Sequence, residues 1–314
     1  MITKEKALEI YNVIKENPKV IIHRHDRPDG DALGSQMGLK QAILATFPTH
    51  DVKIVGDINK RYSWMGEMDV VEDDEYDNAL VFVLDSGALK LISDDRYSKG
   101  KILVKIDHHI AQDIYGDISV VDTSYESCCG LIGDIIILSG MKLNDAGASS
   151  LFTGMVTDSG RFRYSSTTSN TYKVVSELMK YNINTDYIFN NLYVEKLENV
   201  KLKAELITKF KVTEKGVAYL INTKEEIKRY GLSIFDISRG MVNIMAGIEN
   251  IPIWANFSED ENGAIYVELR SAGININQIA VAHGGGGHLQ ASGCTVKSFD
   301  EVYQIISELD NLIE

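Results

Sequence analysis

Residues 20–35, VIIHRHDRPDGDALGS, place a short apolar run directly before a cluster of charged side chains. The run VII is β-branched, which favours a buried strand, and DALGS begins a segment with helical character. Two histidines and three aspartates stand between them within nine residues. Side chains of this kind are costly to pack together unless a cation lies among them. The stretch therefore predicts a strand, a turn and a helix that hold a positively charged ligand.

The first half of the chain repeats this alternation of strand and helix. Further apolar runs occur at VKIVG, ALVFVLDS, KILVKIDHH and ISVVD, with helical patterns around them. This rhythm predicts an α/β protein with a mostly parallel sheet flanked by helices. From about Ser127 to Tyr181 the pattern is helical, and the last third is rich in strands again. We expect an N-terminal domain over residues 1–187, a connecting helix over 188–207, and a smaller α/β domain with a mixed sheet over 208–314.

The composition argues against several classes of function. The chain has 314 residues and a formal net charge of −13, which disfavours broad binding to a long nucleic-acid duplex. Its start has scattered charges and no apolar run suited to a signal peptide or membrane span, so we expect a cytoplasmic protein without membrane contact. The odd set Cys128, Cys129 and Cys294, with no CxxC, predicts buried thiols in a reducing compartment.

Acidic and histidine side chains follow three of the predicted strands where each strand ends. In open parallel sheets these carboxyl ends form the edge at which ligands bind. Carboxylates with imidazoles and no thiolates suit manganese, iron or zinc. Four aspartates and two histidines suffice for two divalent ions, which would activate a shared water for phosphoryl displacement. The candidate side chains are His25, Asp29, Asp31, Asp85, Asp107, His108 and His109, with Asp158 from a later helical segment.

Each motif taken alone also has a structural explanation. Asp85 could cap a helix, PDGD could be a simple turn, and GGGG near the C-terminus could be a flexible loop. The distribution of histidines favours the functional interpretation. Six of the seven lie within HRHDRPDGD, DHH or HGGGGH, which a random scatter over the surface would not produce.

Five motifs, spread in order over nearly the whole chain, resemble those of a known family. HDRPDGDALGS, VLDSG, IDHH and TDSGRF are similar to the four successive motifs of the DHH phosphoesterases. The later LRSAGININQIAVAHGGGGHLQASG resembles the glycine-rich signature of their DHH-associated C-terminal domain. The short two-domain layout is most similar to the nanoRNase branch, bacterial enzymes that act on very short oligoribonucleotides and on pAp.

The resemblance implies roles for the acidic and histidine residues. Two divalent ions, Mn²⁺ by preference, would share Asp85 as a bridging ligand. Asp107 would orient the adjoining histidines, and His109 would donate a hydrogen bond or proton at the scissile phosphate. His23 stands outside this set and is expected to pack or support. One ion would be held by His25, Asp29 and Asp85, and the other by Asp31, Asp85, His108 and Asp158.

The resemblance also implies that the second domain binds the substrate. The glycines of GGGGH would let backbone amides approach a phosphate, although four glycines stand where the family pattern needs three. The nucleotide would lie in the cleft between the domains, and the width of this cleft would limit substrate length. The expected substrate contacts are Arg161, Arg270, Gly285, Gly286, Gly287 and His288.

The implied function is hydrolysis of nanoRNA and pApA to mononucleotides and of pAp to AMP, by two-metal activation of a bridging water. This combines an oligoribonuclease with a 3'(2'),5'-bisphosphate nucleotidase, and the layout is compatible with a homodimer. A cyclic-di-AMP phosphodiesterase is an alternative, because ring opening and cleavage of a linear dinucleotide use the same motifs. A non-catalytic nucleotide-binding regulator is a second alternative, although the complete set of candidate ligands argues against it.

Overall fold

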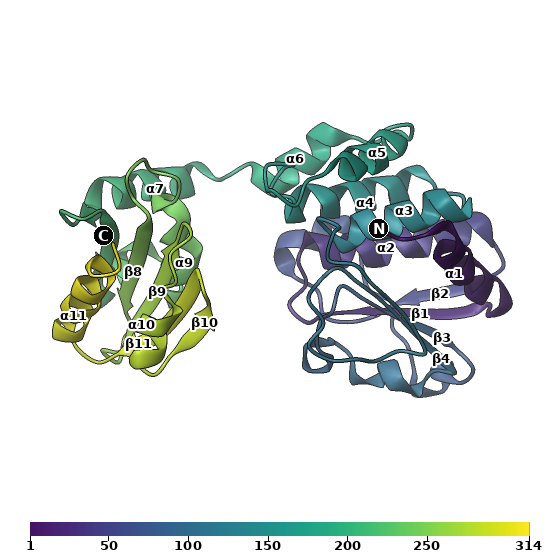
Figure 1. Ribbon diagram of the computed structural model, residues 1–314, viewed down its shortest axis with the longest axis horizontal. Coiled ribbons are helices and arrows are strands. Elements are labelled where there is room, and N and C mark those ends of the chain that lie inside the picture. Colours follow the sequence, from purple (N-terminus) through teal and green to yellow (C-terminus); the bar gives the residue numbers. More distant parts are fainter. Residues whose placement is uncertain (314) are drawn as a thin grey trace. The chain divides into compact units, whose positions relative to one another are not determined.

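The computed structural model describes residues 1–313, and the chain divides into two compact units, Met1–Val194 and Glu195–Glu314. The predicted fold class is confirmed, with a parallel sheet flanked by helices in the first unit and a mixed sheet in the second (Figure 1). The predicted connecting segment, residues 188–207, spans the division between the units. Among residues 1–313, no helix combines the length and the apolar character that crossing a membrane requires.

The sheet of the first unit has the strand order β2-β1-β3-β4-β5, and all its neighbouring strands are parallel. The order reverses between β1 and β3, so the carboxyl ends of these two strands form the crevice at which such sheets bind ligands. The predicted apolar runs form β1 (Lys19–Arg24), β2 (Asp51–Ile54), β3 (Leu80–Leu84), β4 (Ile102–Asp107) and β5 (Ile118–Val121).

The two faces of this sheet are covered differently. Alternate side chains of a strand point to opposite faces, so Val20 and Ile22 pack under the helices, whereas Ile21 packs against Tyr76 on the other face. Figure 1 shows α1, α2, α3 and α4 over the first face. The helices of this unit are α1 (Lys4–Glu16), α2 (Gly30–Thr46), α3 (Cys128–Ser139), α4 (Asp145–Asp158), α5 (Ser169–Leu178) and α6 (Thr185–Tyr193). Its 3-10 helices are η1 (Lys60–Met65), η2 (Asp73–Tyr76), η3 (Leu89–Leu91) and η4 (Asp95–Lys99).

Helices α2 and α4 approach one another closely because glycines repeat every fourth residue along α2. A Cβ atom on Gly34 would lie 2.5 Å from the carbonyl oxygen of Ser150, and one on Gly38 would lie 2.5 Å from the side chain of Leu151. The start of α2 therefore lies beside the end of α4, where Asp158 stands. The glycine spacing thus brings two segments far apart in the sequence to one edge of the sheet.

The second unit has a six-stranded sheet in the order β10-β11-β9-β8-β7-β6, in which only β7 and β8 are parallel. Helices α7 to α9 pack on one face, and α10 and α11 pack on the other. Its strands are β6 (Lys211–Val212), β7 (Val217–Asn222), β8 (Ile253–Glu259), β9 (Ile265–Ser271), β10 (Gly286–His288) and β11 (Ala291–Val296). Its helices are α7 (Leu197–Lys209), α8 (Lys224–Tyr230), α9 (Ile234–Met241), η5 (Val242–Met245), α10 (Asn277–Ala282) and α11 (Phe299–Asp310).

Two of the purely structural explanations considered for the motifs are wrong. Gly286 and Gly287 do not form a flexible loop, because they pair with Gly293 and Ser292 of β11 at the edge of the sheet. Asp85 does not cap a helix either, since the next helical turn, η3, is preceded by Ala88. Asp85 instead directly follows strand β3, with its side chain buried.

Candidate metal centre

The carboxyl edge of the first sheet brings the predicted acidic and histidine side chains together. His25 follows β1, Asp85 follows β3, and His108 and His109 follow β4. Helix α2 supplies two aspartates at its start and α4 supplies one at its end. Three overlapping groups have candidate ligand atoms within 4.8 Å of one another, namely His25–Asp29–Asp85, Asp31–His108–Asp158 and Asp85–His108–His109.

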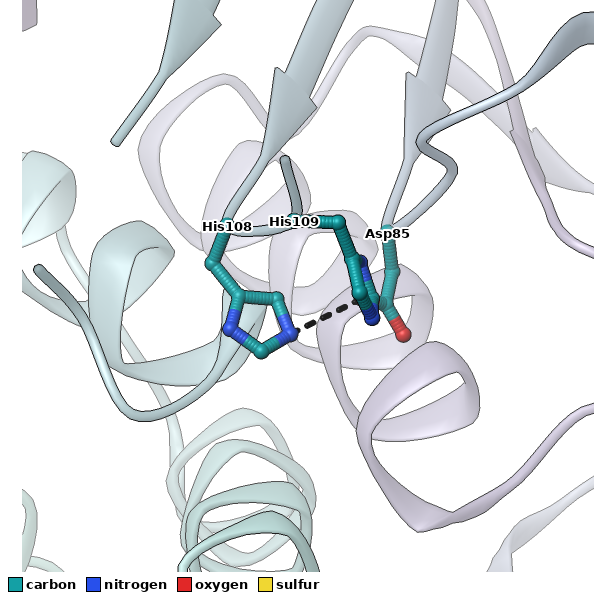
Figure 2. A group of neighbouring side chains, drawn as sticks. All are labelled: Asp85, His108 and His109. Atoms are coloured by element: carbon teal, nitrogen blue, oxygen red, sulfur yellow. Dashed lines mark ion pairs between the residues drawn. The ribbon is translucent and has the colours of Figure 1, made fainter. Parts of the chain in front are cut away.

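Asp85 lies at the centre of these groups. Its Oδ2 is 3.4 Å from Nε2 of His25, while its Oδ1 is 3.4 Å from Nε2 of His108 and 3.4 Å from Nδ1 of His109. Figure 2 shows both imidazoles of the DHH segment directed toward this carboxylate. The side chain is 2% exposed, and the backbone has a φ of 53°, a strained value for a residue other than glycine. The two carboxylate oxygens therefore face two different groups of candidate ligands.

Two atoms of this centre are buried without any hydrogen-bond partner among residues 1–313. They are Oδ1 of Asp85 and Nε2 of His108, and the latter also lies 3.7 Å from Asp31 and 3.5 Å from Asp158. Buried polar atoms are nearly always satisfied, because leaving one unpaired is costly. A divalent cation would satisfy both atoms, and mixed carboxylate and imidazole ligands suit such an ion. The residues present therefore fit a metal centre.

The net effect of burial and neighbouring charges is to raise the pKa values of three members of the centre. Burial alone would lower the pKa of His108, but the carboxylates of Asp85, Asp31 and Asp158 outweigh it and raise this pKa to about 10. Burial and the charge of Asp85 raise the pKa of Asp158 to about 6, against the opposing effect of His108. Burial also raises the pKa of Asp31, as do Asp85 and Asp158. Burial and neighbouring carboxylates thus disfavour the negative charge at Asp31 and Asp158.

Asp31 is held by the start of helix α3. The backbone N–H of Cys128 donates to Oδ2 of Asp31 at 2.7 Å, and the N–H of Cys129 donates to Oδ1 at 2.9 Å. Unpaired N–H groups at a helix start favour a carboxylate. The cysteines themselves are free and buried, as predicted. This contact was not predictable from the sequence, because any residue type can supply a backbone N–H donor.

The DHH segment is oriented by groups behind it. Asp107 Oδ1 lies 2.9 Å from Nδ1 of His109, and Nδ1 of His108 lies 3.3 Å from the carbonyl oxygen of Tyr125. The Nζ atom of Lys105 is 3.5 Å from Oδ2 of Asp107 and 4.3 Å from the ring centroid of Tyr115. These contacts fix the ring orientations and leave the other nitrogen of each imidazole to face the centre or solvent.

Lys105 is a residue that the sequence analysis did not select. It is 1% exposed, and its partner Asp107 is fully buried, so the two charges form a buried ion pair directly behind His109. A lysine inside a strand ordinarily lies at the surface. Its position two residues before Asp107, and so on the same side of β4, was the only available signal.

The loop that carries His25 is held in place by the buried side chain of Arg24. Arg24 is fully buried, donates to the carbonyl oxygen of His25 at 2.9 Å, and pairs with Oδ1 of Asp57 at 3.1 Å. His23 lies on the far face of the sheet, 3.0 Å from the hydroxyl of Tyr76, and burial lowers its pKa to about 4. His23 thus packs in the interior and takes no part in the acidic centre.

The predicted substrate contacts of the second unit line one cavity of about 610 Å³, together with Glu268 and Arg239. Arg270 is already paired there, with Nη2 2.9 Å from Oε2 of Glu268. Gly287 has a φ of 139°, and a Cβ atom there would lie 2.6 Å from the carbonyl oxygen of Ala291. Only glycine fits this position. The cavity is lined by Arg270, Gly284, Gly285, Gly286, Gly287 and His288. The remaining predicted contact, Arg161, belongs to the first unit.

Comparisons with known proteins agree with this architecture. Residues 19–155 match the DHH family, N-terminal domain, and residues 234–314 match the DHHA1 domain. The chain is 38% identical over 301 residues to a probable bifunctional oligoribonuclease and PAP phosphatase NrnA of Streptococcus mutans, covering 96% of this chain and 97% of that protein. It is 36% identical over 307 residues to the bifunctional oligoribonuclease and PAP phosphatase NrnA of Bacillus subtilis, covering 97% of each.

Among solved structures, an exopolyphosphatase-related protein from Bacteroides fragilis is similar over 99% of this chain and 97% of its own, with a TM-score of 0.85 and 26% sequence identity. The fold and the carboxylate–histidine centre define a phosphoesterase of the α/β class. The chain belongs to the DHH family, in its NrnA branch, and is an enzyme of that family. The predicted family resemblance is thereby confirmed.

Proposed function

We propose that this chain is a manganese-dependent phosphoesterase that hydrolyses very short oligoribonucleotides, including pApA, to mononucleotides and dephosphorylates pAp to AMP. The names of its relatives in Streptococcus mutans and Bacillus subtilis support this substrate class. The observation that carries the chemistry is Nε2 of His108, a buried, unpartnered atom that faces three carboxylates. Such an atom is what a divalent cation at a phosphoesterase centre would satisfy.

The contacts of Asp85 support two metal positions with one shared ligand. Its Oδ2 faces the group of His25 and Asp29, and its Oδ1 faces the group of His108. Two divalent ions, when bound, would stabilise the charge of the phosphate and lower the pKa of a water molecule shared between them. The mixture of imidazole and carboxylate ligands favours Mn²⁺ over Mg²⁺ or Ca²⁺.

His109 is the proposed proton or hydrogen-bond donor to the leaving oxygen. Its side chain is 51% exposed, so it is accessible to substrate, and its Nδ1 is held by the Asp107 carboxylate. The hydrogen bond to Asp107 is the main cause that raises the pKa of His109, which favours the protonated imidazole. A protonated imidazole fixed at Nδ1 presents Nε2–H as a donor.

We place the scissile phosphate at the acidic centre and another phosphate of the substrate in the glycine-rich cavity of the second unit. There Arg270 offers a guanidinium fork and His288 an exposed imidazole, while the glycines allow close approach of a phosphate. In this proposal the first unit cleaves the phosphate ester and the second unit binds another phosphate of the substrate.

The test is chromatography of products from the manganese-loaded protein. Separate reactions contain pApA, pAp, a short RNA, cyclic di-AMP or pyrophosphate, with the Asp85→Asn variant as a control. We expect pApA, pAp and the RNA to yield mononucleotides, with pyrophosphate intact. Faster opening of cyclic di-AMP would move the chain to the cyclic-dinucleotide class. No hydrolysis of any substrate with metal bound would contradict the proposed activity.

A further inference from the structure

Three residues from distant segments meet in the first unit and form a cluster, Arg61–Tyr193–Arg161. The guanidinium carbon of Arg161 lies 4.7 Å from the ring centroid of Tyr193, a cation–π contact. Arg61 donates from Nη2 to the carbonyl oxygen of Leu192 at 3.4 Å, next to the same tyrosine. The cluster thus places the guanidinium of Arg161 on the ring of Tyr193, while the guanidinium of Arg61 lies at the backbone of Leu192 and 5.6 Å from the ring centroid of Tyr62.

Two connections join this cluster to segments that carry candidate ligands of the proposed metal centre. Asn59, two residues before Arg61, donates from Nδ2 to the carbonyl oxygen of Pro28 at 3.0 Å, and Pro28 directly precedes the candidate ligand Asp29. Arg161 follows the candidate ligand Asp158 by only three residues. Both arginines are therefore attached to segments that carry ligands of the centre.

The backbone beside Arg161 is strained. Gly160, Arg161 and Phe162 have φ values of 57°, 64° and 61°, so three successive residues are left-handed and two of them are not glycine. Residues with a Cβ atom adopt this conformation at a cost, and it persists only where surrounding contacts impose it. Here the N–H of Phe162 donates to Oγ of the buried Ser159 at 2.8 Å, and the N–H of Arg161 donates to the carbonyl oxygen of Val156 at 2.8 Å. The strained turn directs Arg161 onto Tyr193.

Like Arg27 and Arg163, the two arginines of the cluster form no side-chain ion pair among the described residues. Arg24 and Arg96 instead form salt bridges with aspartates. Both arginines of the cluster are exposed, in a protein whose net charge is −13. Unpaired, accessible guanidinium groups beside a phosphoesterase centre are suited to a second phosphate.

We propose that the Arg61–Tyr193–Arg161 cluster binds the phosphate that follows the scissile one in an oligoribonucleotide. The proposal rests on the proposed function, in which one phosphate occupies the acidic centre and one the cavity of the second unit. Substrate pAp has only these two phosphates, so it leaves the cluster empty. A trimer such as pApApA has a third. The cluster is therefore a specificity site that acts on chains of three or more nucleotides and not on pAp.

The test compares pApApA with pAp in variants of the cluster. Arg61→Met removes one charge of the cluster and keeps an aliphatic stem for packing, and the double variant Arg61→Met/Arg161→Met removes both charges. We expect kcat/KM for pApApA to fall about tenfold to a hundredfold, mainly through KM, because a charge-assisted contact is lost. For Arg61→Met, which is not among the predicted contacts of pAp, the value for pAp should stay within about twofold of the wild type. Arg163→Met is the matched control, since it removes an exposed arginine two residues away without touching the cluster.

The outcomes separate the specificity site from the activity itself. A loss confined to the trimer supports the cluster, and an equal loss on both substrates or no loss on the trimer overturns it. If the wild type hydrolyses neither substrate, the proposed function fails. The affinity for fluorescent pApApA then tests the cluster, which is supported if Arg161→Met binds more weakly than Arg163→Met and overturned if the two bind equally. Melting temperatures verify folding, and Arg161→Lys, which keeps the charge without the fork, replaces any methionine variant that does not fold.

Discussion

The acidic centre of the first unit and the glycine-rich cavity of the second differ in how completely their polar groups are satisfied. In the centre, Asp85 and His108 are largely buried and each keeps an atom without a partner. In the cavity, Arg270 already has a carboxylate partner in Glu268, and His288 is exposed to water. The centre therefore has unsatisfied atoms that a cation would complete, whereas Arg270 in the cavity could exchange its contact with Glu268 for a ligand.

The centre and the cavity also differ in the interactions that hold them in shape. The centre depends on side chains held by buried supports, such as Lys105 behind Asp107. The cavity depends on backbone that only glycine allows at Gly287. The centre is thus built from buried side chains, and the cavity from backbone shape. Four experiments test this contrast.

The largest effect is expected from Asp85→Asn. The amide keeps the shape of the side chain but cannot serve as the shared anionic ligand, so metal occupancy should fall and hydrolysis should drop at least about a thousandfold, equivalent to several kcal/mol of lost stabilisation. Metal analysis and rate measurements on the same preparation test this. A variant that keeps two equivalents of metal while losing activity would contradict the shared-ligand role.

Metal removal should lower the stability of the first unit and leave that of the second unchanged. Because Mn²⁺ is proposed to bind only the folded first unit, an excess of about one hundred times its dissociation constant should stabilise that unit by about 2.7 kcal/mol, and chelation should abolish the gain. Hydrogen exchange with and without Mn²⁺ is the measurement. Protection should rise around His25, His108 and Cys128 and stay constant in β10 and β11. An equal increase in protection in both units would contradict the prediction that Mn²⁺ binds only the first unit.

Lys105→Met tests the support behind the centre. The apolar side chain leaves the buried carboxylate of Asp107 without its cation, so we expect stability to fall by about 3 kcal/mol. The turnover number should fall about tenfold to a hundredfold with metal content and KM retained, since His109 loses its fixed orientation. Urea unfolding and steady-state kinetics measure these effects. Lys101→Met, an exposed lysine before the same strand, is the control.

The smallest effect is expected from a substitution in the cavity, and it should strengthen substrate binding where the other changes weaken function. Glu268→Gln removes a negative charge beside the proposed phosphate position and frees the guanidinium of Arg270. The KM for pAp should therefore fall by a few-fold, roughly 1 kcal/mol, while the turnover number stays constant. A higher KM would show that Glu268 is needed to position Arg270, and the cavity would then depend on supports as the centre does.

The candidate site was predictable to the extent that strand ends mark it. Asp85 and His108 each follow a buried apolar run, and neighbouring parallel strands end at one edge, so their meeting follows from the sequence pattern. The contacts of Lys105 with Asp107, and of Arg270 with Glu268, were not predictable in this way. A lysine within a strand and an alternating Glu–Leu–Arg sequence are typical of ordinary surfaces, and only burial distinguishes them.

The sequence by itself determined the fold class, the family and the group of acidic and histidine residues at the sheet edge, because these depend on apolar periodicity and on residue type along short segments. Only the tertiary structure decided which atoms of that group lack partners and that backbone N–H groups of α3 hold Asp31. It also decided that Arg161 lies on Tyr193 and that Arg61 contacts the backbone of Leu192. Such contacts join segments more than thirty residues apart, here Arg161 and Tyr193 or Asp31 and Cys128, and depend on distances of a few ångströms. Local pattern does not encode those distances, because they are set by how the helices and strands pack.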